Sequence, residues 1–219
     1  MNRNDLARLL DHSVLKPEAV EADIAAGADV VREWRVGCYC VQPWWVRRAS
    51  AALAGTGAVV ASVVGFPHGC DVTPVKADAA RRAVASGAGE IDVVAAFGAL
   101  RSGDTRGFAA DIAAVVAASG HAAVKVILEA AALTDDEKRL ACRIVRESGA
   151  AFVKTSTGFH PAGGATTADV RLLRAETGSG FGVKASGGIR TLADVEAMLA
   201  AGANRIGTSA SAAILGALA

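Results

Sequence analysis

Two lysines occupy matching places in two strand-like segments of this chain of 219 residues. Lys154 and Lys184 each follow an apolar run and precede small hydroxyl residues and glycine. An ammonium group is costly to bury among apolar side chains without a compensating partner. If the two segments are neighbouring strands, the like charges lower the pKa of one lysine, and its amine becomes a nucleophile near neutral pH. The pair therefore favours carbonyl chemistry through a lysine Schiff base over the alternative of two surface lysines at strand ends.

Glycine-rich segments follow the last three strand-like segments and predict a phosphate site. Gly158 follows the segment of Lys154, and residues 163–167 then lead into a helix. Glycines let backbone N–H groups approach an anion, and the start of a helix adds a favourable partial charge. Three such clusters at one rim indicate phosphate binding more strongly than a single glycine pair does. The residues predicted to bind the phosphate are Gly158, Gly187, Gly188, Gly207 and Ser209.

The overall composition narrows the classes of partner. The formal net charge is +1 and no long basic run occurs, so neither nucleic acid nor an anionic membrane is expected as a partner. No apolar segment reaches the roughly 18 residues that span a bilayer, and the first five residues are polar. We therefore expect a cytoplasmic protein.

Cysteines and histidines give no sign of a metal or of a disulfide framework. The chain has four of each, without paired ligand spacing, so no metal site is expected. Cys38 and Cys40 would share one face of a strand and are predicted to pack there. His68 is expected either at the pocket mouth or in a turn. No dinucleotide-binding or Walker motif occurs, and no cofactor is expected.

Strand-like and helix-like segments alternate along the whole chain. Several strand candidates are continuous apolar runs, which is typical of strands covered on both faces. Eight units without an interrupting linker favour an α/β fold of one (β/α)8 TIM barrel over an open doubly wound sheet, with residues 1–219 as one domain. The strand candidates are residues 11–16, 37–42, 58–66, 90–97, 122–130, 151–158, 181–186 and 205–209.

Helical spacing and capping signals agree with this alternation. Val75, Ala79 and Ala83 recur at every fourth position between the third and fourth strand candidates, as one face of a helix would. Residues 134–137 form a capping box that predicts the start of a helix, and Gly149 lies where that helix should end.

In a barrel of this kind, reactive groups gather at the carboxyl ends of the strands. Asp92 is the most informative of them, because carboxylates are rare inside an apolar run such as residues 90–94. A structural ion pair is the alternative for each residue taken alone. The charged residues expected at that end are Asp11, Lys16, Asp92, Lys125, Glu129, Lys154 and Lys184.

These motifs resemble those of the 2-deoxyribose-5-phosphate aldolase family, whose members are class I aldolases with a (β/α)8 barrel. The resemblance runs from residues 11–17 to residues 205–210, nearly the full chain. Its most specific motifs are residues 152–158, with the sequence FVKTSTG, and residues 183–191, with the sequence VKASGGIRT.

The resemblance implies a role for each matching residue. Lys154 matches the Schiff-base lysine, and Lys184 matches the neighbouring lysine that lowers its pKa and assists proton transfer. Asp92 matches the proton-relay carboxylate, supported by Asp11 and Lys125. The glycine clusters and the serine after them match the phosphate cradle.

The implied activity is reversible cleavage of 2-deoxy-D-ribose 5-phosphate to D-glyceraldehyde 3-phosphate and acetaldehyde, in deoxyribonucleotide catabolism. One alternative is another phosphosugar lyase or a transaldolase-like Schiff-base enzyme. Another is a non-catalytic phosphosugar-binding barrel, which the combination of Lys154, Lys184 and Asp92 disfavours, because a binding protein needs no poised amine beside a carboxylate.

The chain departs from the family pattern at a few positions. Gln42 stands where Asn is common, Ala130 where Thr is frequent, and Ser211 where Gly is frequent. The sequence ends at Ala219 without the tyrosine-ending tail of some members. We therefore expect the Schiff base to be retained and proton transfer not to rely on such a tail.

Two tryptophans bear on assembly. Trp44 and Trp45 follow Pro43 and are expected to anchor a helix or to form part of a subunit contact, rather than to touch a ligand. A homodimer or a higher homo-oligomer is expected.

Overall fold

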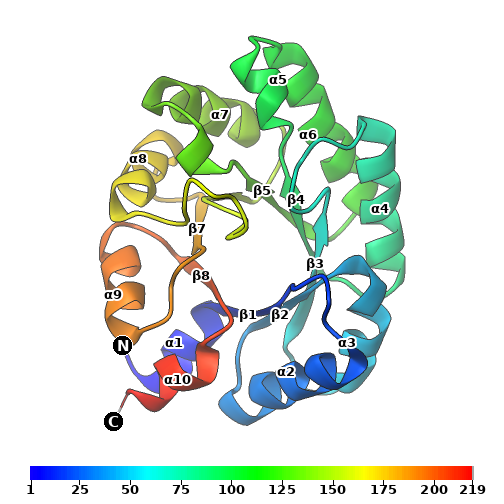
Figure 1. Ribbon diagram of the computed structural model, residues 1–219, viewed down its shortest axis with the longest axis vertical. Coiled ribbons are helices and arrows are strands. Elements are labelled where there is room, and N and C mark those ends of the chain that lie inside the picture. The colour runs from blue at the N-terminus through cyan, green and yellow to red at the C-terminus, as the bar shows by residue number, and fades with distance from the viewer. Residues whose placement is uncertain (219) are drawn as a thin grey trace.

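The computed structural model describes residues 1–218 and contains eight parallel strands that close into a barrel (Figure 1). Each strand pairs with the next along the chain, and β8 pairs with β1, with Leu10 opposite Ile206. This confirms the predicted (β/α)8 barrel. The strands are β1 Leu10–Val14, β2 Cys38–Val41, β3 Val59–Val64, β4 Glu90–Val94, β5 Ala123–Ile127, β6 Phe152–Lys154, β7 Gly182–Ser186 and β8 Arg205–Thr208.

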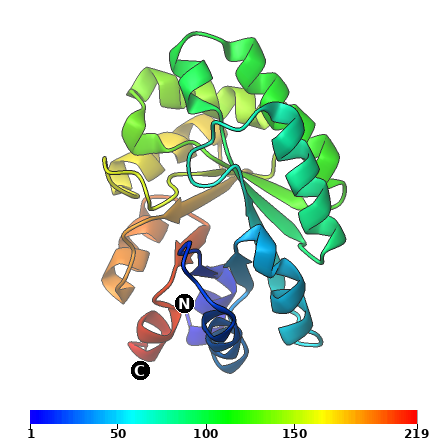
Figure 2. The same cartoon turned by 45° about the vertical axis from the view of Figure 1, so that its right-hand side comes forward.

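Helices surround the barrel, and both views show them on the outside of the sheet (Figures 1 and 2). Among the described residues, none of them is long and apolar enough to cross a membrane. The α-helices are α1 Arg3–Leu9, α2 Glu21–Trp34, α3 Val46–Ala52, α4 Thr73–Ala85, α5 Phe97–Arg101, α6 Thr105–Ser119, α7 Asp135–Glu147, α8 Thr167–Thr177, α9 Leu192–Ala200 and α10 Ser211–Gly216, with 3-10 turns η1 Pro43–Trp45 and η2 Ala130–Ala132.

The helix boundaries follow the capping signals of the sequence. Thr134 caps α7 by accepting a hydrogen bond from the N–H of Glu137, whose carboxylate accepts one from the N–H of Thr134. Gly149 has a φ of +81° just after the helix ends, a conformation that glycine adopts at little cost. The predicted start and end of this helix are therefore confirmed.

The helical spacing of Val75, Ala79 and Ala83 is confirmed, because all three residues lie in α4. Val75 is 52% exposed, and the residues that face inward are Lys76, Ala80 and Ala83. The spacing alone did not show that Lys76 is on the buried side, where its ammonium contacts Asp111 of α6 at 2.7 Å.

The tryptophan prediction is half confirmed. Trp45 is partly buried and packs against the core, as a helix anchor would. Trp44 is 84% exposed and anchors nothing within the described chain.

The barrel interior is lined by small side chains at β2 and β3. Cys38 and Cys40 of β2 pack there with Ala61 and Val63 of β3. This confirms that the two sulfurs share a face and pack. The remaining strands bring charged side chains into the same interior.

Candidate active site

The two lysines lie side by side in the sheet. Lys154, the last residue of β6, pairs in register with Lys184 of β7. On its other side Lys154 pairs with Ile127 of β5. The adjacency on which the Schiff-base hypothesis depends is therefore present, and both side chains are almost completely buried.

The carboxylate of Asp92 connects three lysines. Its Oδ2 accepts hydrogen bonds from the Nζ atoms of Lys154 and Lys184, each at 2.7 Å. Its Oδ1 accepts one from the Nζ of Lys125, also at 2.7 Å. Asp92 is fully buried, so these three ammonium donors replace the water that an ionised carboxylate needs.

A second group of ion pairs continues this network on the side of Asp11. Asp11 accepts a hydrogen bond from Lys184, lies 3.3 Å from the Nζ of Lys125, and accepts a bond of 2.9 Å from Arg205. Glu90 contacts the Nζ of Lys125 at 2.5 Å and accepts a bond of 3.1 Å from Arg205. Arg205 and Glu90 complete the network, and the sequence motifs did not single them out as site residues.

The expected location of these groups at the carboxyl ends of the strands is wrong for four of them. Asp11 is the second residue of its five-residue strand, and Asp92, Lys125 and Lys184 are each the third residue of theirs. They fill the middle of the barrel rather than its rim. Lys154 is the one lysine of the network that ends its strand, and Lys16 lies beyond β1 at the surface.

Glu129 does not join the lysines either. It is buried just after β5 with a φ of +55°, a left-handed conformation rare for a side chain of this kind. Its carboxylate accepts hydrogen bonds from the hydroxyl of Thr157, at 2.5 Å, and from the N–H of Thr157. Glu129 thereby fixes the loop that follows Lys154.

Burial and charge separate the two paired lysines. Burial lowers the pKa of Lys154, and this outweighs the opposing effect of Asp92; the charge of Lys184 lowers it further. Burial also acts to lower the pKa of Lys184, but Asp11 and Asp92 together raise it above the ordinary value for lysine. Lys154 is therefore the amine that becomes neutral first.

Asp92 and Asp11 stay ionised. Burial acts to raise the pKa of Asp92, but Lys125, Lys154 and Lys184 hold it well below its usual range. Burial acts on Asp11 in the same way, and nearby cations hold its pKa low as well. The pKa of Lys125 is raised well above that of an ordinary lysine, because Asp11 and Asp92 outweigh its burial.

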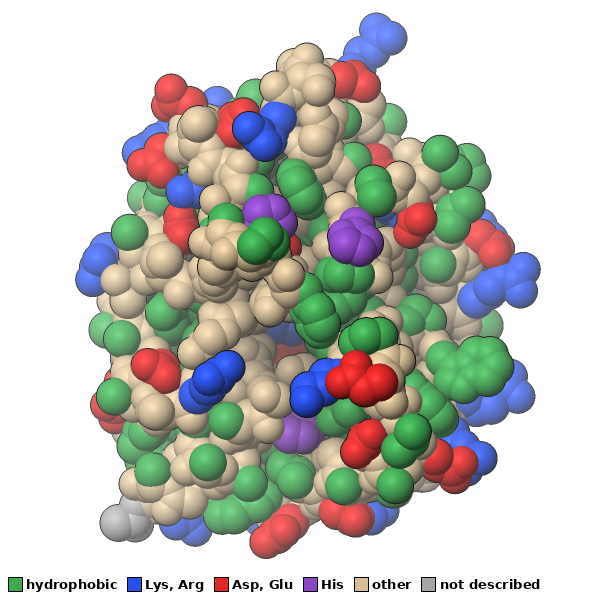
Figure 3. Space-filling view, viewed as in Figure 1, with side chains coloured by type: hydrophobic (Ala, Val, Ile, Leu, Met, Phe, Trp, Pro, Cys, Tyr) green, Lys and Arg blue, Asp and Glu red, His purple; other side chains and the backbone are tan. Residues whose placement is uncertain are grey.

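A cavity of about 930 Å³ opens above this network, and the face seen in Figure 3 is hollowed near its centre. Lys154, Lys184 and Asp11 line the cavity, whereas Asp92 and Lys125 do not. Exposed His68 lies outside its lining, as a turn residue would. All the residues predicted to bind phosphate line it: Gly158, Gly187, Gly188, Gly207 and Ser209.

The loops at the cavity offer free backbone donors. Within residues 1–218, no group accepts a hydrogen bond from the N–H of Gly187, Gly188 or Ser209. Gly187 and Gly188 have φ values of +88° and +82°, which disfavour any other residue. Free N–H groups in glycine loops are suited to a phosphate.

Two glycines have a packing role that the motif alone did not reveal. A Cβ on Gly164 would lie 2.2 Å from the carbonyl oxygen of Gly187, so the loops after β6 and β7 touch only because Gly164 has no side chain. A Cβ on Gly207 would lie 3.1 Å from the Cε of Lys184 and 2.9 Å from the Cβ of Ser186. Gly207 therefore makes room for the Lys184 side chain.

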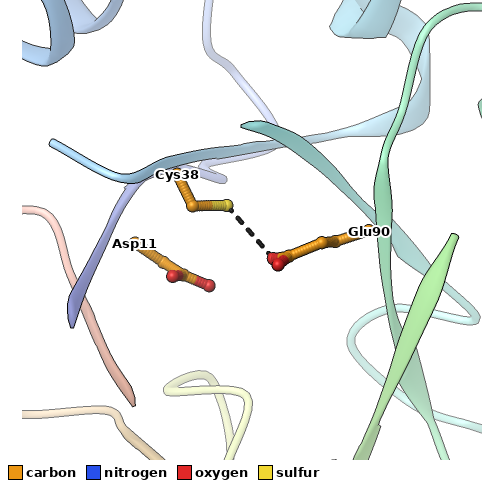
Figure 4. Close-up of side chains that lie close together, drawn as sticks. All are labelled: Asp11, Cys38 and Glu90. Carbon is orange, nitrogen blue, oxygen red and sulfur yellow. Dashed lines mark hydrogen bonds between the residues drawn. The ribbon is translucent and has the colours of Figure 1, made fainter. Parts of the chain in front are cut away.

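Three potential metal ligands lie close together at the base of the network. Ligand atoms of Asp11, Cys38 and Glu90 are within 4.8 Å of one another (Figure 4), a grouping that the sequence spacing did not reveal. Both carboxylates already contact Lys125 and Arg205. The Cys38 thiol bonds Glu90 at 3.5 Å, and burial raises its pKa well above the usual value. The chain's own cations thus satisfy this acidic group.

A closed (β/α)8 barrel with paired interior lysines beneath a glycine-rimmed cavity is the architecture of a Schiff-base aldolase. Residues 6–217 match the family model described as DeoC/LacD family aldolase. The chain belongs to the DeoC/LacD aldolase family.

Individual relatives agree with this assignment. The chain is 50% identical over 210 residues to a deoxyribose-phosphate aldolase of Streptococcus pneumoniae serotype 19F (strain G54), which covers 96% of this chain and 95% of that protein. The tetrameric deoxyribose phosphate aldolase of Aeropyrum pernix superimposes with a TM-score of 0.91 at 33% identity, over 99% of this chain and 92% of that one. The structure "QR15, an Aldolase" superimposes with a TM-score of 0.93 at 36% identity, over 97% and 95% of the two chains.

Proposed function

We propose that the protein is a class I aldolase that reversibly cleaves 2-deoxy-D-ribose 5-phosphate to D-glyceraldehyde 3-phosphate and acetaldehyde. The observation that carries the proposal is Lys154, a buried amine with a lowered pKa in the wall of a cavity rimmed by free backbone donors. The relatives named above support the identity of the substrate. Breakdown of deoxyribonucleotides is the process in which such a substrate arises.

The first step is formation of the imine. Neutral Lys154 attacks C1 of the open-chain sugar, and the carbinolamine loses its hydroxyl as water to leave an iminium. Lys184 donates the proton that the leaving hydroxyl takes up, because it is protonated and lines the cavity. Asp92 bonds both amines and passes protons between them.

The second step is cleavage of the C2–C3 bond, because acetaldehyde retains C1 and C2. Lys184, which gave up its proton in the first step, takes the proton of the C3 hydroxyl, the C3–O bond becomes a carbonyl, and the electrons of the C2–C3 bond move to the iminium to form an enamine. Protonation at C2 and hydrolysis release acetaldehyde and restore the amine. Since Asp92 does not line the cavity, its proton exchange with the substrate passes through Lys184, which bonds Asp92 and lines the cavity.

The remaining predicted residues hold the substrate and the network. Gly158, Gly187, Gly188 and Ser209 bind the phosphate through the backbone, and Gly207 leaves space for Lys184. Asp11 and Lys125 fix the positions and charges of Lys184 and Asp92. Phosphate binding holds C1 in register with Lys154, which uses remote binding energy for positioning.

The test is a coupled assay for glyceraldehyde 3-phosphate with purified protein and deoxyribose 5-phosphate, run beside a panel of other phosphorylated aldol sugars. We expect deoxyribose 5-phosphate to have the highest kcat/KM. Preference for a different sugar would assign the protein to another phosphosugar lyase. Binding of the sugar without turnover would identify a binding barrel instead.

We also propose that residues 1–219 act as one aldolase domain and assemble into a homo-oligomer. The exposed Trp44 and the tetrameric relative from Aeropyrum pernix support assembly. A charged sugar phosphate stays within its compartment, which supports action in the cytoplasm. Sedimentation of the purified chain tests the oligomeric state, and cell fractionation tests the location.

A further inference from the structure

Charge is unevenly shared among the ion pairs inside the barrel. Lys125 contacts three carboxylates, and Lys184 and Arg205 contact two each. Among the carboxylates of residues 1–218, Lys154 contacts that of Asp92 alone, and it shares this carboxylate with two other lysines. One positive charge is therefore in excess. The network consists of the cations Lys125, Lys154, Lys184 and Arg205 and the carboxylates Asp11, Glu90 and Asp92.

Arg205 is the cation of this network that does not release its proton. A guanidinium remains charged at any ordinary pH, whereas an amine can become neutral. Arg205 bonds Asp11 at 2.9 Å and Glu90 at 3.1 Å, and it lies over the ring of Phe152 at 5.4 Å from the ring centre. The charge of Arg205 balances part of the negative charge of Asp11 and Glu90, so less of that negative charge is left to stabilise the protonated lysines. The excess proton is then most easily lost from the lysine with the fewest carboxylate contacts.

We propose that Arg205 and Glu90 are positioning residues that set the charge of Lys154 from the amino-terminal end of the barrel, with Arg205 favouring the neutral amine and Glu90 limiting that effect. The proposal rests on the Schiff-base role of Lys154. Neither residue lines the cavity, so both act through the network and not on the substrate.

The barrel places the two residues symmetrically about Lys154. Arg205 begins β8 and Glu90 begins β4, and each strand lies two strands away from β6. Strands in a sheet are about 4.8 Å apart, which puts each charge roughly 10 Å from the axis of β6. At such a range, and at an effective dielectric constant near 20, a unit charge shifts a pKa by about one unit.

The other titratable groups near Lys154 lie on the strands and loops around it. Burial and Asp92 raise the pKa of Cys40 on β2 to about 11, so its thiol is neutral, and β3 contributes apolar Ala61 and Val63. Burial lowers the pKa of His12 to about 4, so its ring is neutral as well. The charged groups that face Lys154 directly, through Asp92, or across the cavity are Asp92, Lys184, Lys125, Asp11, Lys16, Glu18, Asp23 and Arg190.

The experiment measures the pH midpoint of borohydride trapping by deoxyribose 5-phosphate, read from the intact mass of each variant. Arg205→Met removes a positive charge, so Lys154 binds its proton more tightly, and the midpoint rises by about 0.5 to 1 unit. Glu90→Gln removes a negative charge, and the midpoint falls by a similar amount. The double variant lies close to wild type. Arg205→Lys keeps the charge and leaves the midpoint in place.

Opposite shifts distinguish this charge-setting role from a merely structural one. Damage to packing would lower the amount of trapped protein without moving the midpoint in opposite directions. The matched control is Arg82→Met, because Arg82 is a surface arginine of α4 whose side chain is 79% exposed. If Arg205→Met does not fold, the sign of the Glu90→Gln shift still decides.

Unchanged midpoints, or shifts of the same sign in both single variants, would overturn the proposal. A wild-type protein that traps no sugar at any pH would instead contradict the proposed Schiff-base function itself.

Discussion

Two of the places where the protein buries lysine ammonium groups differ in how the charge is balanced. Between α4 and α6, Lys76 bonds Asp111 at 2.7 Å and the carbonyl of Val94 at 3.0 Å, and Thr73 donates to the same carboxylate. In the barrel interior, three lysines and an arginine share three carboxylates. One site is matched charge for charge, and the other has a cation in excess.

This difference indicates which buried lysine is structural and which is chemical. A fully matched ion pair is not stabilised by losing a proton. If either partner became neutral, the charge of the other would remain buried without a counter-charge. An interior with one surplus positive charge is relieved when one amine becomes neutral. Burial alone therefore does not identify a reactive lysine; the count of nearby opposite charges does.

Removing the surplus amine should have the largest effect. Lys154→Ala should lower kcat by roughly 10⁴-fold or more, the scale observed when a catalytic nucleophile is removed. Steady-state kinetics with deoxyribose 5-phosphate measures this, with circular dichroism as the check that the barrel still folds. A variant with a tenth of the wild-type kcat would show that the interior lysines are not divided as described.

Breaking the matched pair of Lys76 and Asp111 should lower the stability and leave the catalytic rate nearly unchanged. Lys76→Met leaves Asp111 buried without its partner and should lower the free energy of unfolding by about 3–5 kcal/mol. The kcat of the folded fraction should stay within about threefold of wild type, because Lys76 lies between α4 and α6 and does not contact the substrate. Denaturant unfolding and kinetics at low temperature measure the two quantities.

The control for that prediction removes both charges. The double variant Lys76→Met/Asp111→Leu replaces the pair by apolar side chains and should recover most of the lost stability. If Lys76→Met instead behaved like Lys154→Ala, with a folded but inactive protein, the contrast between the two buried sites would fail.

A substitution in the glycine loop after β7 should selectively impair the use of the phosphorylated substrate. Gly188→Asp introduces a side chain at a φ of +82° and a negative charge where the phosphate should bind. It should reduce kcat/KM for deoxyribose 5-phosphate by about 100-fold, which corresponds to a loss of about 2.7 kcal/mol in transition-state stabilisation. The activity toward unphosphorylated deoxyribose should change little. Equal losses for both substrates would show that this loop does not hold the phosphate.

Of the four changes, the substitution of Lys184 should have the smallest effect, and it should appear in the pH profile. Lys184→Leu removes a like charge, so the pKa of Lys154 rises, and the acidic limb of imine formation moves to higher pH by about one unit. Burial is the larger cause of the lowered pKa and persists in the variant, so the midpoint stays below that of an ordinary lysine.

Lys184→Arg is the matched control for this shift. It keeps the positive charge and therefore most of the pKa effect, while a guanidinium cannot take part in proton transfer. If wild type and both variants share one midpoint, Lys184 acts in proton transfer or binding alone.

The sequence was sufficient for the barrel and for the central pair of lysines. Alternating apolar runs and helical segments predicted eight strands, and neighbouring strands in such a barrel place Lys154 beside Lys184. Asp92 was recognisable because a carboxylate is unusual in an apolar run. These features are local, or depend on contacts between consecutive strands.

The missed features depend on closure of the barrel or on the length of side chains. Arg205 reaches Asp11 because β8 pairs with β1, at opposite ends of the sequence. Asp11 and Lys125 lie in the middle of the barrel, which a rule about carboxyl ends of strands does not describe. Lys76 was missed because the spacing alone did not show that it is on the buried side. The spacing of residues along the sequence does not predict these contacts.

The most direct test of the account is to locate the covalent intermediate. The wild-type protein is reduced with borohydride in the presence of deoxyribose 5-phosphate, digested, and mapped by mass spectrometry. We expect one modified position, Lys154, because it is the interior amine whose pKa is lowered and which lines the cavity. Modification at Lys184, or at Lys125 or Lys76, would contradict the claim that the surplus charge of the barrel selects the nucleophile.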